Sequence, residues 1–442
     1  MLCLLAAGVF FTTQLTAQQA TQDSVASWVV ANGPEMVEGY KYLHRHPELS
    51  FHEVESAKLM ASHLQELGFE VTQNVGGTGV VGVLKNGDGP VVLVRTDTDA
   101  LPLEERTGLD YASKVKVKDE HGAEVNVMHA CGHDVHMTVW TGTSAYLATH
   151  LDEWSGTLVF IAQPAEERGA GAKAMLKDGL FEKFPKPNYA LALHVTGALP
   201  VGKIGSCSGY ALANVDSVDI LVRGRGGHGS TPHKTHDPVV LAARIVVDLQ
   251  NIVSREIDAQ EAAVITVGSI QGGTKHNIIP DEARLQITVR SYKPSVREAL
   301  LKAIRRTALH EARAAGFPDS LSPIITVREE EFTPATFNDP ALVKRIDKVF
   351  SDKLGADTVV TVPPVMGGED FGRYGPAANC PSYIFWLGVT EASLWKAAKH
   401  AGGPPMPSTH NSSFAPEPVG SLRTGVIAMT SAVLELMPPK QP

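Results

Sequence analysis

The chain has 442 residues, of which 20% are charged and 6% are aromatic, and its formal net charge is -9. This length is too great for one simple hydrophobic core and indicates two or three domains. The acidic balance, with no basic cluster to compensate for it, argues against a nucleic-acid-binding protein. The expected partners are therefore small molecules or a second copy of the chain.

The N-terminal segment is apolar from Leu2 to Phe11 and then becomes small and polar. This pattern is typical of a secretory signal peptide over residues 1–20, with a cleavage site after Ala17, although the usual basic start is missing. A buried N-terminal helix is the alternative interpretation. No later segment is expected to reach a membrane-spanning length without charges. We therefore expect a periplasmic or secreted protein with no membrane span after signal removal.

The next part of the chain alternates between short apolar runs and helical stretches. Ser50-Phe51-His52-Glu53 predicts a capping box at the start of a helix that Gly68 ends. The apolar runs are 80–84, 91–94, 158–162 and 191–193, and the helical stretches are 137–151 and 170–180. Alternation of this kind predicts an α/β domain with a largely parallel or mixed sheet.

Polar side chains follow three of these runs. Asp97 follows the second run, Glu166 and Glu167 follow the third, and His194 follows the fourth. In open α/β sheets, ligands bind beyond the carboxyl ends of the strands. We therefore expect these side chains to meet at one edge of the sheet.

A second pattern begins near residue 215, where the order of elements becomes β-α-β-β-α-β. Asp237 is the expected N-cap of a helix that begins at Pro238. The expected strands are 215–222, 263–268, 283–289 and 324–327, and the helices are 238–254 and 296–314. This split βαβ order predicts a domain of residues 212–328 inserted between two parts of the first domain, 21–211 and 329–442, the latter with a strand at 383–387.

The most informative motif is His129-Ala130-Cys131-Gly132-His133-Asp134-Val135-His136. Thiolate and imidazole donors at this density suit a transition metal such as zinc better than calcium or magnesium. We therefore predict that Cys131 and His133 bind metal, with Gly132 allowing a close approach between them. The role of His129 stays open; Asp134 could orient an imidazole, and His136 could simply begin the next helix.

The adjacent acids Glu166 and Glu167 point in different directions, so one can bind metal while the other takes a proton from water. A solvated surface turn is the alternative. His194 and His410 are further candidate ligands that position alone does not decide. The four cysteines include Cys3 in the apolar start, Cys131 in the motif, and the isolated Cys207 and Cys380, which either form a disulfide or remain inert thiols.

The glycine-rich loop of residues 224–230 follows an expected strand. It lacks the Gly-Lys-Ser/Thr of a phosphate-binding loop and the spacing of a dinucleotide fingerprint. The loop could present an exposed His228 to another surface, or it could be a flexible turn.

Together these motifs resemble the zinc-exopeptidase-like amidohydrolases of the aminoacylase, carboxypeptidase G and succinyl-diaminopimelate desuccinylase family. The resemblance is greatest to the subfamily of hippurate hydrolases, N-acyl-amino-acid amidohydrolases and auxin-conjugate hydrolases. It extends from His46-Pro47-Glu48-Leu49-Ser50 to His410-Asn411, and the strings 129–134 and 367–371 are specific to that subfamily. It implies an α/β/α catalytic domain with an inserted ferredoxin-like dimerisation or lid domain, and a homodimer.

The resemblance also implies a two-metal site that holds zinc, manganese, nickel or cobalt. Its implied ligands are Cys131, His133, Glu167, His194 and His410. Glu166 is the implied general acid/base, and Asp97 the implied hydrogen-bond partner of a ligand, because Arg95 stands where related branches have a metal-binding histidine. His228 is implied to reach the site of the partner subunit and stabilise the oxyanion, while Asn277 and Arg290 hold the substrate carboxylate.

The predicted function is that of a metal-dependent amidohydrolase. It would cleave the amide bond of N-acyl amino acids, or of related small amides and dipeptides, by two-metal activation of water. One alternative makes Cys131 a nucleophile activated by His133 or His136. A second alternative is a secreted, non-catalytic homologue that binds metal or a ligand.

Overall fold

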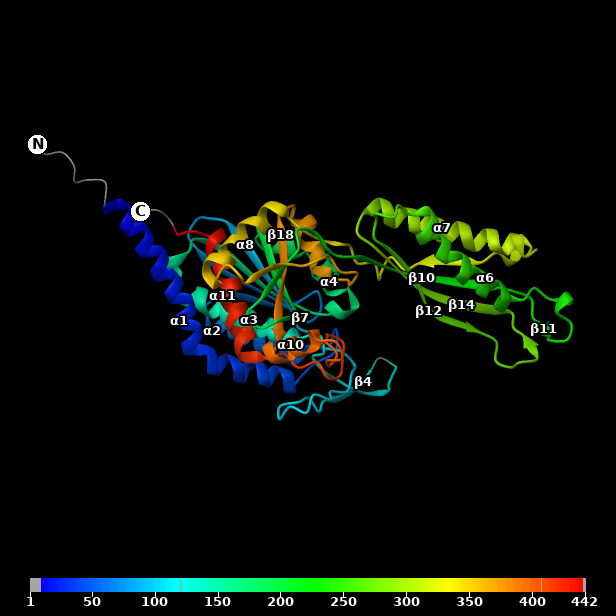
Figure 1. The fold of residues 1–442 in the computed structure, drawn as a ribbon, viewed down its shortest axis with the longest axis horizontal. Coiled ribbons are helices and arrows are strands. Elements are labelled where there is room, and N and C mark those ends of the chain that lie inside the picture. Colours follow the sequence, from blue (N-terminus) through cyan, green and yellow to red (C-terminus); the bar gives the residue numbers. More distant parts are fainter. Residues whose placement is uncertain (1–8, 120, 407, 440–442) are drawn as a thin grey trace, which may run out of the picture. The chain divides into compact units, whose positions relative to one another are not determined.

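The computed structural model describes residues 9–119, 121–406 and 408–439, with side chains from residue 24 onward. The chain forms two compact units (Figure 1). The first contains residues 1–209, 337–363 and 371–442, and the second contains residues 210–336 and 364–370. The second unit thus includes a short segment, 364–370, from a part of the chain that the sequence analysis placed with residues 329–442.

An eight-stranded mixed sheet forms the centre of the first unit, with strand order β1-β2-β6-β3-β7-β18-β8-β17. Its strands are β1 (Glu70–Val75), β2 (Gly79–Asn86), β3 (Val91–Asp97), β6 (Gly156–Gln163), β7 (Tyr189–Pro200), β8 (Ile204–Ser206), β17 (Val359–Thr361) and β18 (Ser382–Thr390). The central strands β6, β3, β7 and β18 are parallel to their neighbours in that group, whereas β1, β2 and β8 introduce antiparallel pairs. The prediction of a largely parallel or mixed sheet is confirmed.

Helices cover both faces of this sheet. They are α1 (Val9–Arg45), α2 (Val54–Glu66), α3 (His133–Thr149), α4 (Gly171–Lys177), α5 (Leu180–Lys183), α8 (Pro340–Leu354), α9 (Tyr374–Ala378), α10 (Ala392–Lys399) and α11 (Pro418–Leu436). Leu158 and Phe160 of β6 belong to the core that packs against α1, α3 and α11. On the opposite face, the Tyr374 hydroxyl donates to the side chain of Gln163. Figure 1 shows α3, α8 and α11 on one side of the sheet and α4 on the other, which gives the predicted α/β/α layers.

The C-terminal helix α11 is long and apolar enough to cross a membrane, with only Arg423 and Glu435 charged in its 19 residues. Because it carries these two charges, it does not contradict the expectation that no later segment reaches such a length without charges. Within the structure, however, 72% of its apolar window is buried. It packs against α1, α3 and α8, as the core helix of a layered domain does.

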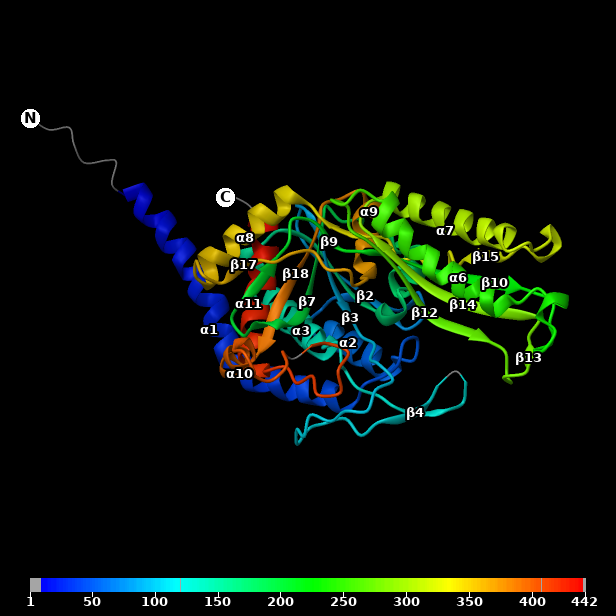
Figure 2. The ribbon, with the colours of Figure 1, turned by 45° about the vertical axis from the view of Figure 1, so that its right-hand side comes forward.

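The second unit is built on a four-stranded antiparallel sheet of order β12-β14-β10-β15, with α6 and α7 on one face (Figure 2). Its main elements are β10 (Asn214–Arg223), α6 (Pro238–Asn251), β12 (Ala263–Gly272), β14 (Glu282–Ser291), α7 (Pro294–Ala314) and β15 (Ile324–Val327). The β-α-β-β-α-β order is confirmed. The predicted N-cap of α6 is also confirmed, because the Asp237 carboxylate accepts the N–H groups of Val239 and Val240.

Short two-stranded sheets complete the fold. They are formed by β4 (Lys116–Lys118) with β5 (Glu124–Asn126), by β9 (Gly209–Leu212) with β16 (Thr336–Asn338), and by β11 (Gly227–His228) with β13 (Ile278–Ile279). Cys207 and Cys380 remain thiols, so the disulfide alternative does not hold.

The N-terminal signal prediction lies partly outside the described residues, since residues 1–8 are not described. From Val9 the backbone is helical and continues as α1 to Arg45. The side chains of Val25, Val29 and Tyr40 on this helix are buried in the core of the first unit. The signal peptide itself stays a prediction.

The predicted capping box at the start of α2 is wrong. The Ser50 hydroxyl donates to the carboxylate of Asp99 at 2.6 Å, and one Glu53 oxygen accepts the N–H of Ala165 at 2.8 Å. The first turn of α2 is capped instead by Glu48, whose carboxylate accepts the N–H groups of residues 55 and 56. Ser50 and Glu53 therefore hold loops that follow the sheet strands.

Candidate active site

The polar residues that follow β3, β6 and β7 lie close together, as the sequence predicts. Asp97 ends β3, and the pair Glu166–Glu167 forms a short turn after β6. His194 lies within β7, which continues past it to Pro200 rather than ending there. The N-terminus of α3 reaches the same place, because the Nε2 atom of His133 is 3.6 Å from an oxygen of Asp97.

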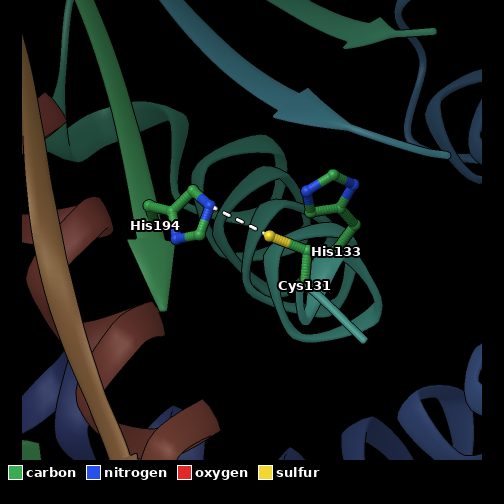
Figure 3. A group of neighbouring side chains, drawn as sticks. All are labelled: Cys131, His133 and His194. Atoms are coloured by element: carbon green, nitrogen blue, oxygen red, sulfur yellow. Dashed lines mark hydrogen bonds between the residues drawn. The ribbon is translucent and has the colours of Figure 1, made fainter. Parts of the chain in front are cut away.

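Cys131 lies between two imidazoles. Its sulfur is 3.4 Å from Nε2 of His194 and 3.2 Å from Nε2 of His410. An oxygen of Glu167 is in turn 3.4 Å from Nε2 of His410. Figure 3 shows the sulfur directed toward the His194 ring, with the His133 ring on its other side. Ligands of one tetrahedral zinc ion lie roughly 3.5 Å apart, given metal–ligand bonds of about 2.0–2.3 Å, so these spacings are those of a metal centre.

The ligand atoms form two groups that share the Cys131 sulfur. One consists of Cys131, His133 and His194, and the other of Cys131, Glu167 and His410, with the atoms of each group within 4.8 Å of one another. The structure thus brings together all five residues that the sequence analysis predicted as ligands.

Two buried atoms in this cluster lack a hydrogen-bond partner among the described residues. They are Nε2 of His133 and Oε1 of Glu167, which are 3.9 Å apart. Leaving a buried polar atom unpaired costs free energy, and metal ions bound in the cluster would satisfy both atoms. The donor set of one thiol, three imidazoles and a carboxylate therefore fits a borderline-soft divalent metal ion.

Two of the imidazoles are oriented by backbone carbonyl groups. Nδ1 of His133 is 2.7 Å from the carbonyl oxygen of Asp99, and Nδ1 of His194 is 2.8 Å from that of Val195. Since a carbonyl oxygen only accepts, each ring donates from Nδ1, and Nε2 is the atom left to bind metal. In His133 the metal would displace a proton from Nε2. Burial lowers the pKa of His194 to about 3, which keeps its ring neutral.

The site contains more negative than positive charge. Burial alone would lower the pKa of His133, but Asp97, Asp99 and Glu167 outweigh it and raise that pKa to about 10. Burial, reinforced by Glu167 and Glu166, holds the pKa of the Cys131 thiol well above its usual range. A divalent cation would offset this repulsion and allow Cys131 to bind as a thiolate.

The loop that carries the two glutamates is fixed by acids that the sequence analysis did not identify as functional. The carboxylate of Asp99 accepts the N–H of Glu166 and the N–H of Glu167, each at 3.1 Å. Glu53 holds the preceding residue, Ala165, which has a left-handed φ of 50°. In the sequence, the position of Asp99 two residues after Asp97 could have indicated that it lies near the site.

Two other backbone positions near the site have positive φ. Gly132, at φ 77°, is the N-cap residue directly before α3, and a Cβ atom there would lie 2.5 Å from a methyl group of Val195. Glycine is therefore required here by the contact with β7, whereas the predicted effect of Gly132 on the approach of Cys131 to His133 stays a prediction. His410 has φ 61°, and its N–H donates to the carbonyl of Ala130 at 2.7 Å. Left-handed conformations of non-glycine residues concentrate at functional sites.

The three residues of the motif whose roles stayed open make different contacts. Asp134 accepts a 2.6 Å hydrogen bond from His44 of α1 and thus orients no ligand imidazole. His136 is the fourth residue of α3 rather than its first, and its ring bonds to Asp97 and to the N–H of Val195. His129 is buried, and neither of its ring nitrogens has a hydrogen-bond partner among the described residues.

The remaining predicted site residues lie in the second unit. His228 pairs with Ile278 in the β11–β13 ladder, and the N–H of Gly229 donates to the carbonyl of Asn277 at 2.9 Å. The structure therefore places Asn277, in the turn just before β13, beside the end of β11 that carries His228. Arg290 lies on β14, where its guanidinium donates to the carbonyl of Met366, and no hydrogen bond between described residues joins it to His228 or Asn277.

Ser230 fixes the tautomer of His228. Its backbone N–H donates to Nδ1 of His228 at 3.1 Å, and its hydroxyl oxygen is 2.7 Å from the same atom. Because an amide N–H only donates, Nδ1 must accept, and the ring proton of neutral His228 lies on Nε2. This exposed ring therefore presents an N–H donor to the solvent.

Comparison with known proteins assigns the chain to a family. Residues 93–401 match the model of peptidase family M20/M25/M40. The chain belongs to this family. It is 39% identical over 348 residues to the hippurate hydrolase of Campylobacter jejuni, covering 78% of this chain and 85% of the relative. It is 33% identical over 395 residues to the IAA-amino acid hydrolase ILR1-like 2 of Arabidopsis thaliana, covering 87% and 84%.

A solved structure supports the same assignment. A Bacillus subtilis protein described as a dinuclear metal binding peptidase of the M20 family superimposes with a TM-score of 0.72 and 30% identity, over 91% of this chain and 98% of that protein. As a member of peptidase family M20/M25/M40 with this donor set, the chain is a metal-dependent hydrolase of the amidohydrolase branch.

The geometry argues against Cys131 as a nucleophile activated by His133 or His136. A thiol nucleophile needs a nearby base that favours its thiolate form. Both ring nitrogens of His136 are engaged by other groups, and Nδ1 of His133 bonds to Asp99. The imidazoles in contact with the sulfur are those of His194 and His410, which belong to the two ligand groups.

Proposed function

We propose that this enzyme hydrolyses the amide bond of N-acyl amino acids with two divalent metal ions. The observation that carries the proposal is the pair of ligand groups that share the Cys131 sulfur. Cys131, His133 and His194 would hold one ion, and Cys131, Glu167 and His410 the other. The ions, when bound, would activate water near neutral pH and polarise the amide carbonyl. Zinc, manganese, nickel and cobalt all suit this donor set.

Glu166 is the proposed general base and acid. It is buried, its backbone N–H is held by Asp99, and one of its oxygens is 3.9 Å from Nε2 of His133. From this position its carboxylate can take the proton of the attacking water and return it to the leaving amine. Glu167, with its N–H held by the same aspartate, is directed to His410 instead.

His228 is the proposed oxyanion donor, acting in the site of the partner subunit of a homodimer. The Ser230 contacts place its proton on Nε2, which is the form that can donate to a developing oxyanion. Asn277, which lies beside it, and Arg290 are proposed to bind the substrate carboxylate. Asn277 offers amide donors and Arg290 a cation.

Replacing His228 with alanine is expected to reduce kcat by roughly a hundredfold, or about 3 kcal/mol, as for removal of an oxyanion donor. Metal content should be unchanged, because His228 belongs to neither ligand group. Mixing this variant with an inactive Glu166 variant should restore part of the activity if two subunits build each site. The absence of recovery in verified mixed dimers would contradict sharing.

The substrate class rests on the relatives, one named for hippurate and the other for IAA-amino acids, both of which are N-acyl amino acids. We expect hydrolysis of N-benzoyl, N-acetyl or dipeptide substrates after loading with zinc, manganese, nickel or cobalt, and loss of turnover after chelation. The measurement is release of the free amino acid across this panel. Turnover that survives complete chelation, or no turnover with any substrate and metal, would overturn the proposal.

Export to the periplasm or the medium is a separate proposal that rests on the apolar start of the sequence alone. N-terminal sequencing of the protein purified from its native source would test it. A mature chain that begins near Gln18 supports export, and one that begins at Met1 contradicts it.

A further inference from the structure

The strands β3 and β7 separate where they approach the site. They pair from Val92 with Tyr189 to Val94 with Leu191. In that register the end of β3 at Asp97 would face His194, but no ladder pair between described residues of these strands continues past Leu191. The N–H of Val195 on β7 therefore lacks a strand partner on this side. An acceptor must come from elsewhere, because unpaired buried N–H groups are rare in folded proteins.

The imidazole of His136 fills this gap. Its Nδ1 is 2.7 Å from an oxygen of Asp97, and its Nε2 accepts the N–H of Val195 at 2.9 Å. Because the amide can only donate, Nε2 is the acceptor and the ring proton is on Nδ1, from which it is donated to Asp97. The ring thus acts as a spacer with one donor and one acceptor, which joins the two strands as a peptide group would.

Val195, the residue whose N–H His136 holds, also orients a proposed ligand through its carbonyl group. The carbonyl of Val195 accepts the Nδ1 proton of His194, and that ring then directs Nε2 to the Cys131 sulfur at 3.4 Å. The other oxygen of Asp97 is fixed by Arg95 at 2.7 Å. A continuous series of hydrogen bonds therefore leads from the buried arginine to the ligand group.

We infer that His136 is a positioning residue that holds β7 and Asp97 apart at the distance the metal centre requires, and so sets the direction of the His194 ring. The inference rests on the proposed function, in which His194 is a ligand. Asp97, His133 and His136 are themselves close enough to hold an ion. Both nitrogens of His136 are already engaged, however, so it orients a ligand and does not bind metal.

The test compares three variants of the full-length enzyme. His136→Leu removes both hydrogen bonds, and His136→Gln keeps an amide donor and a carbonyl acceptor. His63→Leu is the matched control, since His63 also bonds to α3, through the carbonyl of Thr141. The readouts are metal affinity by competition with a chelator, the thiolate-to-metal absorption band of the cobalt-loaded protein, and kcat.

For His136→Leu we expect metal affinity and kcat to fall about 10- to 100-fold, as for other partners of metal ligands, and the cobalt band to shift. His136→Gln should recover most of the metal affinity and most of kcat, and His63→Leu should match the wild type. Unchanged affinity and spectrum in a folded His136→Leu protein would overturn the inference. If that variant does not fold, His136→Gln decides alone: a wild-type band supports the inference, and a lost band overturns it.

A separate variant distinguishes this failure from that of the proposed function. His194→Ala should lose metal if His194 is a ligand. If His194→Ala loses metal while His136→Leu keeps the metal affinity and spectrum of the wild type, only the positioning role is rejected. Full metal retention in His194→Ala would reject the ligand assignment, and with it this inference.

Discussion

Replacing Glu166 with glutamine is expected to lower kcat at least about a hundredfold while metal content is retained. An amide has nearly the size of the carboxylate but cannot accept the proton of the attacking water, and a positioned base contributes about 10²- to 10⁴-fold. The loop should keep its conformation, because Asp99 holds it through the backbone N–H of Glu166 and not through the side chain. The measurement is kcat on an N-acyl amino acid, with metal content determined on the same sample.

Two neighbouring variants provide the controls for this experiment. Glu166→Asp keeps a carboxylate and should retain intermediate activity. Glu167→Gln should lose metal, because its carboxylate faces His410 and His133. Turnover of Glu166→Gln within a few-fold of the wild type, with a full complement of metal, would show that another group takes the proton.

The catalytic cluster could be predicted because its donors follow buried strands or lie in one dense motif. Apolar runs located β3, β6 and β7, and parallel strands bring the residues that follow them to one edge of the sheet. The position of His410 could not be derived in this way. It lies in a loop far along the chain, and its place depends on a left-handed backbone and a bond to Ala130, which no periodicity encodes.

The acids and imidazoles around the ligands were mostly missed, and the reason is physical. Glu53 fits the pattern of a helix cap equally well, yet its carboxylate is used by the N–H of Ala165, more than a hundred residues away in the chain. His136 resembles an ordinary helical residue until the separation of β3 and β7 is seen. Local patterns indicate which residues can form a hydrogen bond, but tertiary structure decides which bond is made.

Stability is expected to depend on a buried group of charged side chains that joins α1 to α3. The ring of His44 lies between Asp134 at 2.6 Å and Glu105 at 3.0 Å. Burial alone would lower the pKa of His44, but the hydrogen bonds and charges of these two carboxylates outweigh it and raise that pKa to about 9. The folded protein therefore holds this proton more tightly than the unfolded chain, whose histidines titrate near pH 6.5.

The sign of the pH dependence follows from this difference. The stabilisation is fully present below about pH 6.5 and is lost as the pH rises through about 9, and a shift of this size corresponds to roughly 3 kcal/mol. His44→Leu should cost about 3–5 kcal/mol near neutral pH, because it leaves two buried carboxylates without their cation. The free energy of unfolding of the wild type and of His44→Leu is measured in urea at pH 6.5 and 9.5. It gives both the cost of the substitution and the change of that cost with pH.

His63→Leu is the appropriate control, since burial lowers the pKa of His63 and its contribution therefore has the opposite pH dependence. The difference in unfolding free energy between the wild type and His44→Leu should shrink by about 3 kcal/mol from pH 6.5 to 9.5, as the wild type loses its charged histidine. The corresponding difference for His63→Leu should not shrink in this range. An equal cost of His44→Leu at both pH values would mean that His44 stabilises the start of α3 by packing alone, and that its charge contributes nothing.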